Sequence, residues 1–230
     1  QLYPLTTKFH TTENKERLQQ TYCLGAKYTL LLGVLASTCI FIFAEPFARL
    51  WLLDSLGADY LIVAEVMKAF AIVDLMTYAS GTQWPILLGM RKLKFLSILL
   101  IATAFLNIVV SVYFVGYTAA GVVGVLYGTI ISKLIRIVLL TIYVVRSVGI
   151  RMIDYVHQSI IGPAWCLFFS GMMGGVLTWN FSCDSWIELL FMVGVTSLVW
   201  IVSCWFIGLN STERYHILEA IKKIYQKVFH

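Results

Sequence analysis

The sequence predicts an all-α, polytopic membrane protein. Of its 230 residues, 60% are hydrophobic and 13% are charged, whereas soluble domains are typically about half apolar and about a quarter charged. The apolar residues stand in continuous runs such as LLLGVLASTCIFIFA, without the alternation that is typical of a barrel strand. Because a helix satisfies its own backbone hydrogen bonds in lipid, each long run is expected to be helical.

Six runs reach or approach the roughly 20 residues that a helix needs to cross about 30 Å of hydrocarbon. They cover residues 28–45, 60–80, 95–115, 119–145, 158–179 and 186–207. We therefore predict six transmembrane helices joined by short loops.

The five cysteines and four histidines are dispersed, and no CxxC or CxxH spacing occurs. Cysteines within apolar runs are most simply interpreted as small buried side chains. The spacing offers no Cys/His set that would hold a metal. The sequence therefore predicts neither a metal site nor a cofactor.

Every second connection between the predicted helices is basic. The basic segments carry Lys8, Lys15, Arg17 and Lys27 before the first helix, Arg91, Lys92 and Lys94 after the second, Arg146 and Arg151 after the fourth, and Arg214, Lys222, Lys223 and Lys227 in the tail. The other three connections, near residues 46–59, 116–118 and 180–185, contain one arginine and three aspartates. Because basic loops stay inside, this pattern predicts that both ends of the chain are cytoplasmic. Basic cytoplasmic loops also account for most of the net charge of +5 without a nucleic-acid partner.

The two ends of the chain carry further signals. The opening QLYPLTTKFH is typical of the end of a helix, which suggests that the chain is the C-terminal part of a longer protein. Residues 210–230 predict an amphipathic helix anchored on the inner leaflet, with Asn210 and Glu213 as its capping pair. Its apolar face would consist of Ile217, Leu218, Ile221, Ile224, Tyr225 and Val228.

Two cations interrupt the fourth apolar run, in GTIISKLIRIVLL. At 100° per residue, Lys133 and Arg136 are about 60° apart and share one face of the helix. In a helix that begins near Ala119, Lys133 would lie about 21 Å from the outer end, too deep for its side chain to reach water. A charge in a span costs about 2.5–3.5 kcal/mol and usually faces protein or a water-filled cavity. The pair therefore predicts a cavity that binds an anionic head group.

The second predicted helix carries Glu65, Lys68 and Asp74. Glu65 and Lys68 are three residues apart near the outer end and can pair with each other. Asp74 lies at about the same depth as Lys133, so it either neutralises Lys133 or couples transport to protons or sodium. In the third helix, a lone Asn107 predicts a hydrogen bond between helices.

Three stretches resemble one known family. KERLQQTYCLGAKYTLLL, following LYP, resembles the cytoplasmic stretch between two helices of polysaccharide flippases, and GTQWPILLGMRKLKFLSIL resembles their next basic loop. FLNIVVSVYFVGYTAAGVVGVLYGTIIS resembles their Asn-bearing helix, short glycine hairpin and glycine-rich return helix. The family is the polysaccharide-transporter branch of the multidrug/oligosaccharidyl-lipid/polysaccharide (MOP) exporter superfamily, which includes O-antigen flippases.

The resemblance implies a fold of two six-helix lobes around a central cavity, with two added helices in some members. Residues 1–150 would hold the second-lobe helices, beginning at the end of helix 8, and residues 151–230 the two additional helices and the cytoplasmic tail. The first lobe would then precede this chain. The expected location is a bacterial cytoplasmic (inner) membrane.

The resemblance also implies a function in polysaccharide and lipopolysaccharide biosynthesis. Family members flip undecaprenyl-pyrophosphate-linked oligosaccharide between leaflets, and Lys133 and Arg136 are the expected contacts of the pyrophosphate. Such a protein is a transporter and not an enzyme. Its expected partners are the lipid-linked oligosaccharide, membrane lipids, the first lobe of the same chain and a polysaccharide polymerase.

Three other functions stay open on the sequence alone. An ion-coupled multidrug or metabolite exporter of the same fold would depend on a carboxylate such as Asp74. A membrane scaffold without transport would need the two cations only for folding. A membrane enzyme would need polar catalytic residues in its loops, and the outer loops here are short and nearly featureless.

Overall fold

The computed structural model describes residues 15–118, 121, 123–215 and 218–219, and this part of the chain is helical with no strand. Its long helices are α2 (Lys15–Leu56), α3 (Tyr60–Ser80), α5 (Leu93–Tyr117), α6 (Val123–Val148), α8 (Ile161–Asn180) and α9 (Trp186–Ser203). Short helical elements connect or extend them: η1 (Gly57–Asp59), α4 (Gln83–Gly89), α7 (Met152–Tyr155), η2 (Val156–Ile160) and η3 (Cys204–Gly208).

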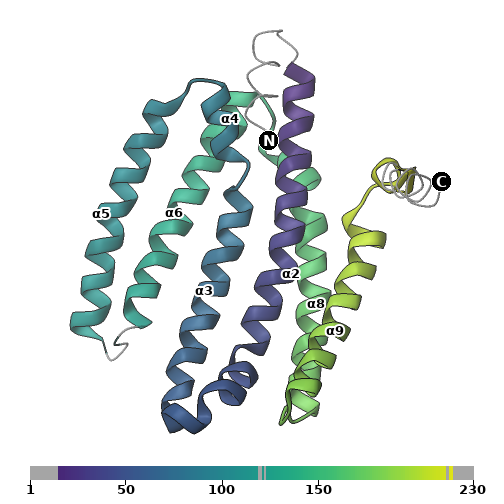
Figure 1. The fold of residues 1–230 in the computed structure, drawn as a ribbon. Coiled ribbons are helices and arrows are strands. Elements are labelled where there is room, and N and C mark those ends of the chain that lie inside the picture. Colours follow the sequence, from purple (N-terminus) through teal and green to yellow (C-terminus); the bar gives the residue numbers. More distant parts are fainter. Residues whose placement is uncertain (1–14, 119–120, 122, 216–217, 220–230) are drawn as a thin grey trace, which may run out of the picture.

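Five helical segments of the described chain are long and apolar enough to cross a membrane. One of them, Lys15–Gly89, contains α2, α3 and α4. It turns at η1, so that α3 runs back alongside α2 (Figure 1). The protein is therefore an all-α, multi-pass membrane protein.

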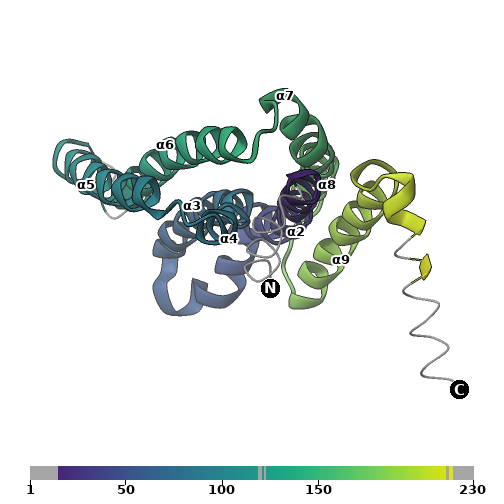
Figure 2. The same cartoon turned by 90° about the horizontal axis from the view of Figure 1, so that it is seen from above.

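The helices form a flat arrangement of three pairs (Figure 2). The pair α2 and α3 lies in the middle, with α5 and α6 on one side and α8 and α9 on the other. In Figure 1 the start of α2, the turn between α4 and α5, and the end of α6 lie at one end of the bundle. The connections α2–α3, α5–α6 and α8–α9 lie at the opposite end. Within the described residues, three of the four segments that the sequence marks as basic thus share one end.

Two segments expected to be loops are helical. The first lies in the range 46–59, where α2 continues through Pro46 to Leu56. Proline removes one backbone hydrogen bond, but Phe47 and Leu50 pack against a buried cluster that includes Leu189 of α9. This burial offsets the lost hydrogen bond. The second is α4, within the expected basic loop after α3; its Ile86 and Leu87 are completely buried.

The helix pairs approach one another closely at glycines. A Cβ atom at Gly33 of α2 would overlap the side chain of Tyr78 in α3. One at Gly128 of α6 would lie 2.8 Å from the backbone nitrogen of Ser111 in α5. One at Gly174 of α8 would lie 2.7 Å from the side chain of Ile42 in α2. Small residues permit such contact between membrane helices, where packing drives association.

We expect Gly128→Ala to destabilise the protein by about 1–3 kcal/mol, because the added methyl group meets fixed backbone of α5. The measurement is the thermal midpoint of the detergent-solubilised protein. Gly194→Ala in α9 is the matched control, because a Cβ atom there meets nothing within 4 Å. Equal midpoints for both variants would contradict the close contact between α5 and α6.

A buried ion pair joins the two ends of the described chain. Lys27, expected in a cytoplasmic segment before the first span, lies within α2 and is 4% exposed. Its Nζ is 2.6 Å from Oε2 of Glu213. The backbone N–H of Asn210 donates to the same oxygen at 2.7 Å, which is one contact of the expected capping pair.

Of the predicted apolar face of the tail, only Leu218 is among the described residues.

We expect Lys27→Met to destabilise the protein by about 3–5 kcal/mol, because it leaves Glu213 buried without its partner. The double variant Lys27→Met/Glu213→Gln should recover part of this loss, since no unpaired charge remains. Unfolding in denaturant, followed by helix content in detergent, measures both. A double variant less stable than Lys27→Met would argue against an unpaired carboxylate as the cause.

Candidate functional site

The two cations predicted to bind an anion line one pocket between α3, α4 and α6. The pocket has a volume of about 150 Å³. It is lined by Thr77, Ser80, Gly81, Trp84, Lys133, Arg136, Ile137 and Leu140. At about 30 Å³ for each water in the liquid, this volume holds roughly five waters or a small polar group.

Two local features place the polar wall of this pocket. Thr77, Ser80, Gly81 and Trp84 recur at helical spacing, so they face the same side as α3 passes into α4. The buried Gln83 then ties α4 to α6, because its Nε2 donates to Oγ1 of Thr141 at 2.6 Å. Hydroxyl groups on α3 consequently face the cations on α6.

Lys133 is held by α3. Its Nζ donates to the backbone carbonyl of Val73 at 2.9 Å and to Oγ1 of Thr77. The Thr77 hydroxyl in turn donates to the same carbonyl at 2.8 Å. The ammonium group is thus fixed across the contact between α6 and α3 by neutral acceptors, and it forms no ion pair with any described residue, although the Asp74 carboxylate attracts it from a longer distance.

Arg136 has no such partners. Its guanidinium makes no hydrogen bond or ion pair with any residue in the described part of the chain, although the residue is half-buried. A guanidinium carries five N–H donors and no acceptor. Arg136 lies about 20 Å along α6 from Val123 and about 18 Å from Val148. It is therefore the cation at the middle of α6, whereas Lys133 lies about 15 Å from Val123.

Asp74 does not hold Lys133 in this structure. It is exposed on α3 and makes no ion pair with any described residue. The Lys133 ammonium instead reaches the carbonyl of Val73, the neighbouring residue, and the Thr77 hydroxyl one turn away. Asp74 also lies outside the lining of the cationic pocket. Its part in ion coupling stays a prediction.

Glu65, Lys68 and Asn107, the other polar residues that the sequence analysis named within spans, lie outside the lining of this pocket. Lys68 Nζ is 2.9 Å from Glu65 Oε1 and also 3.6 Å from Glu45 Oε2. Asn107 accepts a hydrogen bond from Ser111 of its own helix at 3.0 Å. The same hydroxyl lies 3.3 Å from the carbonyl oxygen of Val125, so Ser111 makes the polar link from α5 to α6.

Sequence reasoning missed the α3–α4 side of the pocket. Thr77, Ser80 and Trp84 are common residue types in a membrane helix, and only their recurrence on one face could have drawn attention to them. The described residues contain no group of three His, Cys, Asp or Glu side chains that could hold a metal ion. No family model, curated protein or solved structure matches this chain.

We expect the purified protein to bind inorganic pyrophosphate, and Arg136→Gln to weaken binding by about tenfold or more, since hydrogen bonds to charged groups contribute about 1.5–3 kcal/mol. Tryptophan fluorescence measures binding, and Trp84→Phe identifies the signal that arises in this pocket. Arg146→Gln, at an exposed cation of the same helix, is the matched control. Equal weakening by Arg146→Gln would indicate general charge attraction rather than a site.

Proposed function

We propose that this chain is part of a transporter that flips undecaprenyl-pyrophosphate-linked oligosaccharide across a bacterial cytoplasmic membrane. The observation that carries the proposal is the guanidinium of Arg136, which lies midway along a membrane-spanning helix without a partner among the described residues. Beside it, Lys133 forms no ion pair with any described residue and is held in position by Val73 and Thr77.

The chemistry of the substrate fits this pair. A pyrophosphate carries too much charge to cross hydrocarbon unaided. Two cations near mid-depth lower that barrier, because charge-assisted hydrogen bonds replace part of the lost hydration. The neighbouring surface of α6 is apolar and exposed at Leu134, Val138 and Leu139, so a polyprenyl tail can remain in lipid while the head group enters the pocket. No bond is made or broken in this process, and the protein is not an enzyme.

The resemblance to polysaccharide flippases supports the same function and adds an architecture. In this proposal the long helices make six crossings, with the α2–α3 segment counted as two. The end of the bundle that gathers the basic segments faces the cytoplasm, as does each end of the chain. A first lobe would complete the cavity, and rocking of the two lobes about the site would give alternating access.

The test is complementation of a strain that lacks its own polysaccharide flippase with the complete gene. We expect Lys133→Ala and Arg136→Ala to lower surface polymer by about tenfold or more at matched membrane levels, because each removes a charged contact to the pyrophosphate. Lipid-linked sugar should accumulate inside. Arg146→Ala, at an exposed position of α6, should leave export unchanged. Normal export by both pocket variants would refute the proposal.

Asp74 supports a second candidate function, an ion-coupled exporter of the same fold. Its carboxylate is exposed on α3 with no ion pair in the described structure, as an ion-coupling group requires. If Asp74→Asn alone stops export while the two cation variants retain it, this second function is favoured. If all three variants export normally, a scaffold without transport becomes the better account.

A further inference from the structure

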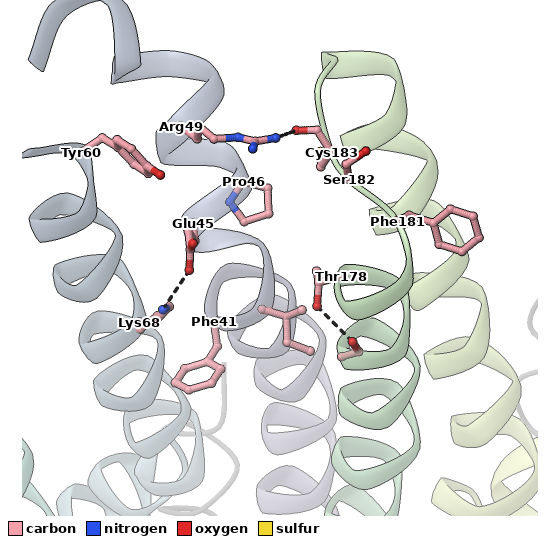
Figure 3. A pocket seen from close by; sticks show the side chains of 12 residues that line it. Phe41, Glu45, Pro46, Arg49, Tyr60, Lys68, Thr178, Phe181, Ser182 and Cys183 are labelled. Carbon is pink, nitrogen blue, oxygen red and sulfur yellow. Dashed lines mark hydrogen bonds and ion pairs between the residues drawn. The ribbon is translucent and has the colours of Figure 1, made fainter. Parts of the chain in front are cut away.

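A second polar pocket lies at the opposite end of the bundle, away from the basic segments. It has a volume of about 470 Å³ and lies between α2, α3 and the connection from α8 to α9 (Figure 3). The connections between helices at this end place the pocket at the level where a bilayer passes from hydrocarbon to head groups. Its lining contains charges of both signs, on Glu45, Arg49 and Lys68.

The charges on the α3 side of the pocket do not balance. One ammonium, Lys68, is shared by two carboxylates, at 2.9 Å from Glu65 and 3.6 Å from Glu45. This group carries one negative charge in excess; Glu45 and Lys68 line the pocket, and Glu65 lies outside its lining as the second partner of Lys68. The side chains of both carboxylates are about half exposed, at 55% and 53%, so each has free oxygen atoms for a cationic group of a ligand.

The α2–α8 side of the pocket presents a cation instead. Arg49 extends from α2 towards the connection between α8 and α9, where its Nη2 donates to the carbonyl of Cys183 and lies 2.6 Å from the Asp184 carboxylate. Both contacts use the same nitrogen, and a guanidinium carries further N–H donors on its other nitrogens. Figure 3 shows Glu45 extending the other way, towards Lys68 of α3. Positive and negative groups therefore face a ligand on opposite sides.

Two apolar pockets adjoin this polar pocket on the side of the middle of the bundle. Phe41 and Ile42 line both the polar pocket and a pocket of about 130 Å³ below it. That second pocket shares Leu75 and Leu167 with a third, apolar one of about 290 Å³ between α3, α6 and α8. A polar head site with two neighbouring apolar pockets suits a lipid head group with its acyl chain.

We propose that this pocket binds a phospholipid whose head group carries a primary amine, such as phosphatidylethanolamine. The phosphate lies at Arg49 on the α8 side, and the ammonium lies at Glu45, which extends from α2 towards α3. One acyl chain descends past Phe41 and Ile42. The head group then lies across the pocket, as the opposite directions of Arg49 and Glu45 require.

The charges discriminate between lipid classes. An anionic head group such as phosphatidylglycerol has no cationic group to offer Glu45, whose one cationic partner, Lys68, is shared with Glu65. A choline head group is positive but has no N–H to donate to a carboxylate. Only an amine head group supplies both the charge and the donors, and charge-assisted hydrogen bonds are the stronger kind. This proposal does not depend on the proposed transport function.

The test is native mass spectrometry of the delipidated protein, expressed from its complete gene, with three lipids of identical acyl chains. We expect phosphatidylethanolamine to bind at least about tenfold more tightly than phosphatidylglycerol or phosphatidylcholine. Glu45→Gln should remove this preference while total lipid binding persists. Asp54→Asn, at an exposed carboxylate of α2 outside the pocket lining, is the matched control and should keep the preference.

Several outcomes would overturn the proposal. One is equal binding of the three lipids by the wild type, and another is an unchanged preference in both Glu45→Gln and Arg49→Gln. A third is displacement of phosphatidylethanolamine by undecaprenyl phosphate, which would assign the pocket to the transported lipid. Thermal midpoints of the variants show whether each remains folded. Failure here would leave the complementation result intact, because the two tests probe different pockets.

Discussion

The bundle depends on the close approach of its helices at positions with room only for glycine. In lipid the hydrophobic effect does not drive helices together, so contact area and small residues do so. Gly33 brings α2 against α3, Gly128 brings α6 against α5, and Gly174 brings α8 against α2. The first two contacts each hold one pair of helices together, and the third joins the α8–α9 pair to the α2–α3 pair. Both pockets are lined by helices of different pairs.

The same packing gives three cations of the membrane-spanning helices three different environments. Lys27 is almost fully buried and has a carboxylate partner, Glu213, as the cost of burying a lone charge demands. Lys133 has neutral acceptors that fix its position, and it forms no ion pair with any described residue. Arg136 has neither kind of partner among the described residues. An anionic ligand that binds between Lys133 and Arg136 would supply the ion-pair partner that both cations lack among the described residues.

Helix α3 is the wall common to both pockets. It contributes Thr77 and Ser80 to the cationic pocket and Lys68 to the polar pocket at the opposite end. The apolar spaces between them also border on α3, at Leu75 and Met76. A shift of α3 would therefore alter the cationic pocket and the lipid site together, since packed helices move as rigid elements.

The sequence by itself determined what depends on neighbours along the chain. Continuous apolar runs indicated an all-α membrane protein, the bounds of α3 match residues 60–80, and helical periodicity placed Lys133 and Arg136 on one face.

Tertiary structure alone decided the partners of these charges. Asp74 lies at a depth that suits Lys133, yet rotation of α3 presents Val73 and Thr77 instead. Lys27 meets Glu213 across 186 residues, and α2 continues past Pro46 because α9 buries Phe47 and Leu50. Each of these contacts joins segments distant in sequence, where periodicity and propensity carry no information about distance in space.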